Sequence, residues 1–164
     1  MFEAKAIRVD DKTALYRELA QQAGGLLSGE RDAIANAANT AALLFTTLPD
    51  LNWAGFYFLR TQDELVLGPF QGKPACVRIA VGRGVCGTAV LQHRSMLVED
   101  VHAFADHIAC DAASRSELVV PLIRGDRILG VIDLDSPLPA RFDREDQRGM
   151  EAIAEIYVKA SDDI

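Results

Sequence analysis

Segments with helical periodicity lie near both ends of this 164-residue chain, and short strand-like segments joined by turns lie between them. Apolar residues spaced three and four apart predict one helix at about 11–27 and a second at 30–48. The second is rich in alanine, and its spacing places one set of residues on a common side, expected to face the core: Ile34, Ala37, Ala38, Ala41, Leu44 and Phe45. A last helix is expected to begin near Asp143, whose carboxylate can cap it.

The middle of the chain predicts an antiparallel sheet. An aromatic segment at 53–59 has strand character, and 65–67 is its expected hairpin partner. The remaining predicted elements are strands at 77–81 and 96–98, a short helix at 84–92, a long loop at 99–116, and a hairpin of strands at 118–123 and 128–134. This order predicts an α+β fold in which helices pack on a central antiparallel sheet.

Composition is typical of a globular protein, with 49% apolar and 25% charged residues. We expect a single domain over 1–164, with an N-terminal helix at 11–27 and a core at 30–160. The net charge of −7 disfavours binding to nucleic acid. No apolar run approaches a membrane span, and the N-terminus lacks the order of a signal peptide. We therefore expect a cytoplasmic protein with reduced thiols.

Three cysteines, Cys76, Cys86 and Cys110, lie within one short stretch among small or flexible residues. An odd number favours thiol–disulfide exchange over a fixed disulfide framework. Each cysteine taken alone could instead be a small buried apolar residue. A zinc site that also uses His93 and His107 is a further alternative, although the sequence has no pair of cysteines two residues apart.

Five segments together resemble a known family: Asn52–Tyr57, Leu67–Cys76, Gly84–Ala89, His107–Glu117 and Ile132–Pro137. They are similar to the GAF-domain free methionine-(R)-sulfoxide reductases, over about residues 30–158. The resemblance implies a GAF fold, reduction of free L-methionine-(R)-S-oxide, regeneration by thioredoxin and a homodimer. It implies no metal and no cofactor beyond the external reductant.

The resemblance also assigns roles to the cysteines. It makes Cys110 the nucleophile and Cys76 the principal resolving thiol, and it leaves Cys86 as either a second resolving thiol or an auxiliary one. The chemistry agrees, because a thiol oxidised by a sulfoxide becomes a sulfenic acid that condenses with a second thiol. An external dithiol then reduces the disulfide.

The same resemblance makes Glu117 the residue that contacts the sulfoxide oxygen. For that role Glu117 must hold a proton, which a poorly solvated pocket favours by raising the pKa of the carboxyl group. Without the resemblance, Glu117 could equally be a solvated charge at the end of a strand.

Asp133 and Asp135 share one face of a strand, where two like charges are costly unless they meet a cation. The ammonium of a free amino acid is a suitable cation, although a solvent-facing strand edge is the plainer alternative. Trp53 and Tyr57 also share a face, and the resemblance places them around the substrate methyl group. They could otherwise be ordinary core residues.

The segment 98–115 is expected to fold over the pocket and bring Cys110 towards Cys76. Two other functions remain open from sequence. One is a GAF sensor that binds a small ligand without catalysis, and the other is a thiol redox switch without turnover.

Overall fold

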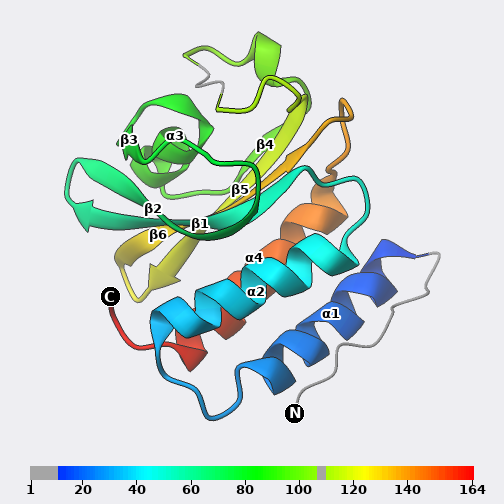
Figure 1. Cartoon of the computed structure of the whole chain (residues 1–164), viewed down its shortest axis with the longest axis vertical. Coiled ribbons are helices and arrows are strands. Elements are labelled where there is room, and N and C mark those ends of the chain that lie inside the picture. The colour runs from blue at the N-terminus through cyan, green and yellow to red at the C-terminus, as the bar shows by residue number, and fades with distance from the viewer. Residues whose placement is uncertain (1–10, 107–109) are drawn as a thin grey trace.

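The computed structural model describes residues 11–106 and 110–164. Within them a six-stranded antiparallel sheet has the order β3-β2-β1-β6-β5-β4 (Figure 1). The strands are β1 Trp53–Thr61, β2 Glu64–Gly72, β3 Arg78–Ala80, β4 Met96–Val98, β5 Ser116–Arg124 and β6 Arg127–Ser136. The predicted α+β class with a central antiparallel sheet is confirmed.

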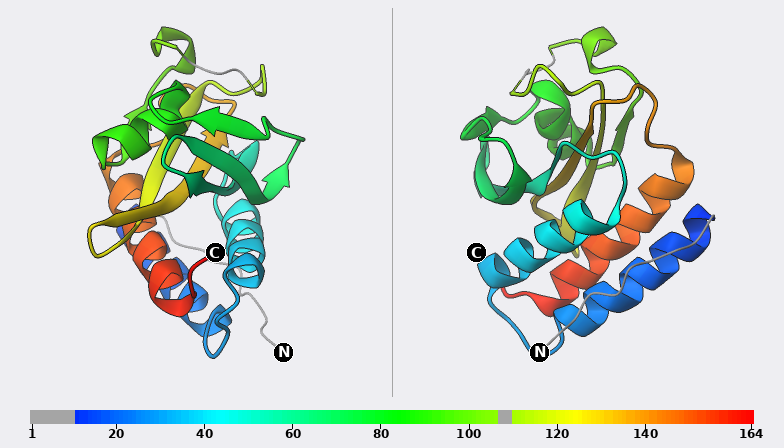
Figure 2. Two further views of the ribbon diagram at one scale, coloured as in Figure 1. Left: turned by 90° about the vertical axis from the view of Figure 1, so that its left-hand side faces the viewer. Right: turned by 45° about the vertical axis from the view of Figure 1, so that its right-hand side comes forward.

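Helices cover the two faces of this sheet unequally. They are α1 Lys12–Leu26, α2 Ala33–Thr47, α3 Gly84–Gln92 and α4 Arg144–Ala160. Figures 1 and 2 show α2 and α4 against one face, with α1 outside them, and the short α3 on the opposite face. None of the helices in 11–106 or 110–164 is long and apolar enough to cross a lipid bilayer.

Alternation along the central strands separates two apolar clusters. Side chains that face the long helices include Ala54, Phe56, Leu118, Val120, Ile132 and Leu134. Their neighbours in sequence face α3 and include Trp53, Tyr57, Val119 and Val131. Successive residues of a strand point to opposite faces, so one strand contributes to both layers. The functional residues discussed below lie on the α3 face.

Most predicted elements are confirmed. The short helix at 84–92 and the strand at 96–98 agree residue for residue, and Asp143 caps α4 by accepting from the backbone N–H groups of Glu145 and Asp146. The second strand is longer than predicted, because β2 continues to Gly72. A 3-10 turn at Val101–Ala103 interrupts the expected long loop.

The predicted core side of α2 is wrong at two positions. Ile34 is 44% exposed and Ala38 is also exposed, whereas Asn36 and Thr40 are buried. Asn36 tolerates burial because its Nδ2 donates to Ser161 Oγ at 3.1 Å and to the carbonyl oxygen of Glu30 at 3.2 Å. In an alanine-rich helix the apolar contrast between faces is weak, so polar residues with specific partners decide which face is buried.

A buried carboxylate joins α1 to α4. Asp146 accepts from Tyr16 Oη at 2.9 Å and forms ion pairs with Lys12 at 2.6 Å and Arg141 at 3.2 Å. Gly149, one turn further along α4, faces the Tyr16 ring so closely that a Cβ there would lie 2.1 Å from Cγ of the ring. The interface therefore combines close packing with a fully paired buried charge.

Replacing Asp146 by alanine is expected to lower the free energy of unfolding by about 3 kcal/mol, because it leaves the largely buried Arg141 guanidinium and the buried Tyr16 hydroxyl without their carboxylate partner. Urea denaturation followed by far-UV circular dichroism measures this loss. Glu145→Ala is the matched control, since Glu145 is the exposed neighbour on the same turn. Equal losses in the two variants would contradict the role of the buried network.

Candidate active site

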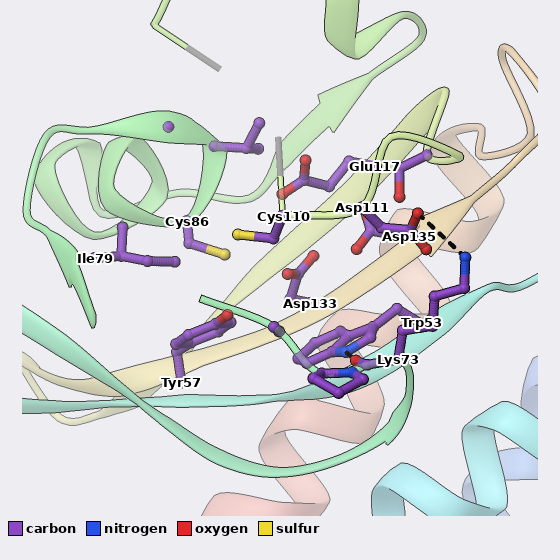
Figure 3. A pocket seen from close by; sticks show the side chains of 15 residues that line it. Trp53, Tyr57, Lys73, Ile79, Cys86, Cys110, Asp111, Glu117, Asp133 and Asp135 are labelled. Atoms are coloured by element: carbon purple, nitrogen blue, oxygen red, sulfur yellow. Dashed lines mark hydrogen bonds and ion pairs between the residues drawn. The ribbon is translucent and has the colours of Figure 1, made fainter. Parts of the chain in front are cut away.

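A pocket on the α3 face gathers nearly all the residues predicted for the site (Figure 3). Of the predicted set, its lining contains Trp53, Tyr57, Cys86, Cys110, Glu117, Asp133 and Asp135. Cys76 is not part of the lining, but it is bonded to Cys110.

Strand register explains why three carboxyl groups meet on the pocket floor. Asp135 on β6 pairs with Glu117 on β5 and with Trp53 on β1, so these residues form one row across the sheet. Asp133 lies two residues back along β6 and shares the same face. The side chains of Ile132 and Leu134 point into the opposite layer, which fixes the orientation of both aspartates.

These carboxyl groups are buried, and burial raises their pKa values. Glu117 and Asp133 are each 6% exposed. Loss of solvation, followed by repulsion from the neighbouring aspartates, raises the pKa of Glu117 well above its usual range. Burial likewise raises the pKa of Asp135, and it raises that of Asp133 to about 7. The floor of the pocket therefore holds protons that exposed carboxyl groups would release at neutral pH.

One oxygen of this cluster lacks a partner. Within the described residues, Asp133 Oδ1 is buried and accepts no hydrogen bond. In Figure 3 the Asp133 carboxylate lies above the Trp53 ring and below Cys86 and Glu117. A buried acceptor without a partner is costly, and a ligand that brings a donor or a cation would remove that cost.

The raised pKa of Asp133 has a consequence for stability. Between about pH 4, where an unfolded carboxyl group ionises, and about pH 7, the folded state holds a proton that the unfolded state has lost. The contribution of Asp133 to the stability of the substrate-free protein is therefore fully present below this window and is lost as the pH rises through it.

Asp133→Asn should weaken this pH dependence and should be more stable than the native protein at about pH 8. Urea unfolding at about pH 5 and pH 8 measures the difference. Asp63→Asn, at the exposed turn between β1 and β2, is the control. A native-like pH dependence in Asp133→Asn would refute the assignment.

Two of the three cysteines are joined by a disulfide, and the third is free. Cys76 and Cys110 form a disulfide with Cα atoms 5.6 Å apart, so the expected approach of Cys110 to Cys76 is confirmed. Cys86 is free and buried in the first turn of α3. Burial, followed by repulsion from Asp133, raises the pKa of Cys86, which keeps it a thiol rather than a reactive thiolate.

A metal could be held here by three side chains. Sγ of Cys86 and a carboxylate oxygen from each of Glu117 and Asp133 lie within 4.8 Å of one another. The zinc alternative considered from sequence shares only Cys86 with this group, because it also used His93 and His107. His93 lies at the C-terminal end of α3 and lines a different pocket, and His107 lies outside the described residues.

Trp53 and Tyr57 make hydrogen bonds to the segment 73–76 that the sequence did not predict. Trp53 Nε1 donates to the carbonyl oxygen of Lys73 at 3.1 Å, and Tyr57 Oη donates to that of Cys76 at 2.9 Å. Both side chains line the pocket as expected, and their rings stack with centroids 5.9 Å apart. The two hydrogen bonds therefore hold the segment that carries Cys76 against the sheet.

Sequence reasoning missed Asn52, Lys73 and Asp111. Asn52 Nδ2 donates to Asp111 Oδ2 at 3.2 Å, and Lys73 Nζ lies 3.6 Å from Asp111 Oδ1. Their positions in the sequence are the one clue that could have marked them, because Asn52 directly precedes the aromatic strand and Asp111 directly follows Cys110. Position alone does not show that polar side chains from distant segments meet.

Comparisons with known proteins identify the fold first. The family model for the GAF domain matches residues 11–160, and the sheet with its covering helices is that of a GAF domain.

Individual relatives narrow the class. The chain is 54% identical to the free methionine-R-sulfoxide reductase of Escherichia coli, over 87% of this chain and 86% of that protein. It is 46% identical to the free methionine-R-sulfoxide reductase of Neisseria meningitidis solved in complex with its substrate, with a TM-score of 0.93 over 98% of this chain and 95% of that one. The reduced form of the enzyme from Staphylococcus aureus is 47% identical, with a TM-score of 0.86 over 96% of this chain and 99% of that one. The chain belongs to the GAF-domain free methionine-R-sulfoxide reductase family.

Proposed function

We propose that this protein is an oxidoreductase that reduces free L-methionine-(R)-S-oxide to L-methionine through a thiol–disulfide cycle. The observation that carries the proposal is the Cys76–Cys110 disulfide beside a pocket with buried, proton-holding carboxyl groups. The relatives named above support the substrate.

The reaction balances with two thiols. The Cys110 thiolate attacks the sulfoxide sulfur while Glu117 protonates the sulfoxide oxygen. The protonated oxygen then passes to the Cys110 sulfur as the new bond between the two sulfurs breaks, which releases methionine and leaves Cys110 as a sulfenic acid. The Cys76 thiol then attacks Cys110, which expels water and forms the disulfide. Two thiols are oxidised, and one sulfoxide is reduced to a thioether and water.

Asp133 and Asp135 are proposed to bind the substrate ammonium. The unpartnered Asp133 Oδ1 supports this, since an ammonium would donate to it and stabilise the ionised carboxylates. A methionine sulfoxide within a peptide chain lacks this ammonium, which would make the protein selective for the free amino acid. Trp53 and Tyr57 would form an apolar wall for the S-methyl group and exclude water.

Asp135→Ala should raise KM for free methionine sulfoxide about tenfold or more, with a smaller effect on kcat, because it removes half of the ammonium site. Steady-state kinetics on the free sulfoxide measures this change. Asp63→Ala, at an exposed turn, is the control. An unchanged KM in both Asp133→Ala and Asp135→Ala would eliminate the ammonium site.

Oxidation of NADPH in the presence of thioredoxin, thioredoxin reductase and the separated sulfoxide epimers tests the whole proposal. Sustained turnover with the R epimer and not the S epimer is expected. Disulfide formation after a single oxidation, without turnover, would favour the redox switch. Binding of the sulfoxide without oxidation of the thiols would favour the small-ligand sensor.

We infer further properties from the family resemblance: thioredoxin returns the disulfide to the dithiol, the protein forms a homodimer, and it uses no cofactor beyond the external reductant. From the sequence we infer that it acts in the cytoplasm. Replacing thioredoxin by a monothiol in the same assay tests the first property, and sedimentation equilibrium tests the dimer.

A further inference from the structure

The N-terminal half of β1, with Asn52 directly before it, is hydrogen-bonded to both segments that carry the disulfide. Hydrogen bonds from its aromatic side chains fix the carbonyl oxygens of Lys73 and Cys76, as described above. Directly before the strand, Asn52 Nδ2 donates to Asp111 Oδ2 at 3.2 Å and to Ser114 Oγ at 3.0 Å. The segment 110–114 and the segment 73–76 are therefore attached to the same short piece of sheet.

Asp111 connects these two segments through its side chain. Its Oδ1 accepts from the backbone N–H of Ala113 at 2.9 Å, which makes a local turn just after Cys110. The same oxygen lies 3.6 Å from Nζ of Lys73, three residues before Cys76. This ion pair, drawn as the dashed line in Figure 3, joins the same two segments as the disulfide.

The contacts of Asp111 differ in strength. Its side chain is only 16% exposed, and the hydrogen bonds from Ala113 and Asn52 favour the ionised form and lower its pKa. Lys73 is 71% exposed, so its ion pair is screened by solvent and contributes less. The Ala113 hydrogen bond shapes the Cys110 segment itself, so most of the holding effect comes from the Asn52 hydrogen bond, which is charge-assisted and about twice as strong as a neutral one.

We propose that Asp111 is a positioning residue that favours closure of the Cys76–Cys110 disulfide by holding the Cys110 segment at the start of β1, to which the Cys76 segment is also hydrogen-bonded. This attachment raises the effective concentration of one thiol at the other, which shifts the exchange equilibrium towards the disulfide. The proposal rests on the proposed function in so far as closure of this disulfide is a step of turnover.

Asp111 takes no part in the bonds that change. In exchange with glutathione, the Cys76–Cys110 bond breaks and one bond forms between two glutathione sulfurs. Two electrons and two protons pass from two glutathione thiols to Cys76 and Cys110. The equilibrium constant of this exchange therefore reports how well the protein positions its own two sulfurs.

Equilibration with defined ratios of reduced and oxidised glutathione, followed by alkylation and mass spectrometry of the cysteine peptides, measures that constant. Asp111→Ala should make closure of the disulfide about tenfold less favourable. Asp111→Asn, which can still accept from Ala113, should show a smaller loss and serves if the alanine variant does not fold. Lys73→Met should change the constant about twofold or less.

Asp106→Ala is the matched control. Asp106 lies in the same connection between β4 and β5, is exposed, and forms an ion pair at 3.7 Å with Arg83 rather than with the Cys76 segment. It should leave the constant unchanged. An unchanged constant in both Asp111 variants, or an equal loss in the Asp106 control, would overturn the proposal.

Thermal unfolding provides a second readout, because coupling between the Asp111 contacts and the disulfide is reciprocal. Asp111→Ala should lower the Tm of the oxidised protein more than that of the reduced protein. Equal losses would mean a purely structural role and would also overturn the proposal. Neither measurement contains methionine sulfoxide, so a failed turnover assay would refute the proposed function and leave this inference standing.

Discussion

Replacing Cys110 by serine is expected to lower kcat/KM for methionine sulfoxide by about a thousandfold or more, the scale of loss when a catalytic nucleophile is removed. A serine hydroxyl is a far weaker nucleophile towards sulfur, and it cannot close a disulfide with Cys76. The thioredoxin-coupled assay measures the loss, and binding of the substrate by calorimetry should survive it. Near-native turnover in Cys110→Ser would refute the proposed cycle.

The other two cysteines supply the comparison. Cys76→Ser should release about one methionine per protein rapidly and then turn over slowly, because the sulfenic acid forms but loses its principal resolving thiol. Cys86→Ser should keep most of the native rate, since Cys86 is buried and remains protonated. Quenched-flow measurement of methionine formed per protein separates these outcomes. A rate as low in Cys86→Ser as in Cys110→Ser would assign the chemistry to Cys86 instead.

Glu117→Gln is expected to lower kcat by about a hundredfold to a thousandfold, the usual contribution of a general acid. Glutamine keeps an N–H donor and the shape of the side chain, but it cannot transfer a proton to the departing oxygen. Glu151→Gln is the control, because Glu151 lies on α4 on the other face of the sheet, where it accepts from Ser95 and Gln147. Native turnover in Glu117→Ala would show that Glu117 is not the acid.

The pH profile gives an independent check on Glu117. Its pKa is raised by burial, so the protonated form persists at neutral pH and native kcat should fall as the pH rises through the raised value. The falling limb should disappear in Glu117→Gln. Because Glu117 is coupled to Asp133 and Asp135, the apparent pKa of that limb belongs to the cluster rather than to one residue.

Local periodicity was enough to predict most of the fold. The helix at 84–92 starts at Gly84, a break that is visible in sequence, whereas its left-handed cap at His93 is not. Asp143 followed by Glu145 and Asp146 marked the start of α4 correctly. Ile34 shows the limit, because it is exposed on α2 while the polar Asn36 is buried with a partner from beyond the end of α4. No local pattern contains that partner.

The active site likewise divides into features that local patterns predict and contacts between distant segments that they do not. Alternation along a strand correctly placed Asp133 with Asp135 and Trp53 with Tyr57, and the family resemblance supplied the cysteines and Glu117. The three carboxyl groups lie close together because β6 pairs with β5, and β1 brings Trp53 beside them. The spacing of residues along the sequence does not determine which strands pair. The hydrogen bonds from Trp53 and Tyr57 to the Cys76 segment likewise required the folded chain.

The three acidic side chains stand on neighbouring strands, and the hydrogen-bond ladder that aligns them is complete without the sulfur–sulfur bond. We therefore expect the floor of the pocket to keep its shape when the disulfide is reduced. An inhibitor that carries an amine and contacts only this floor would bind the oxidised and the reduced enzyme alike, with no need for a reactive group aimed at sulfur.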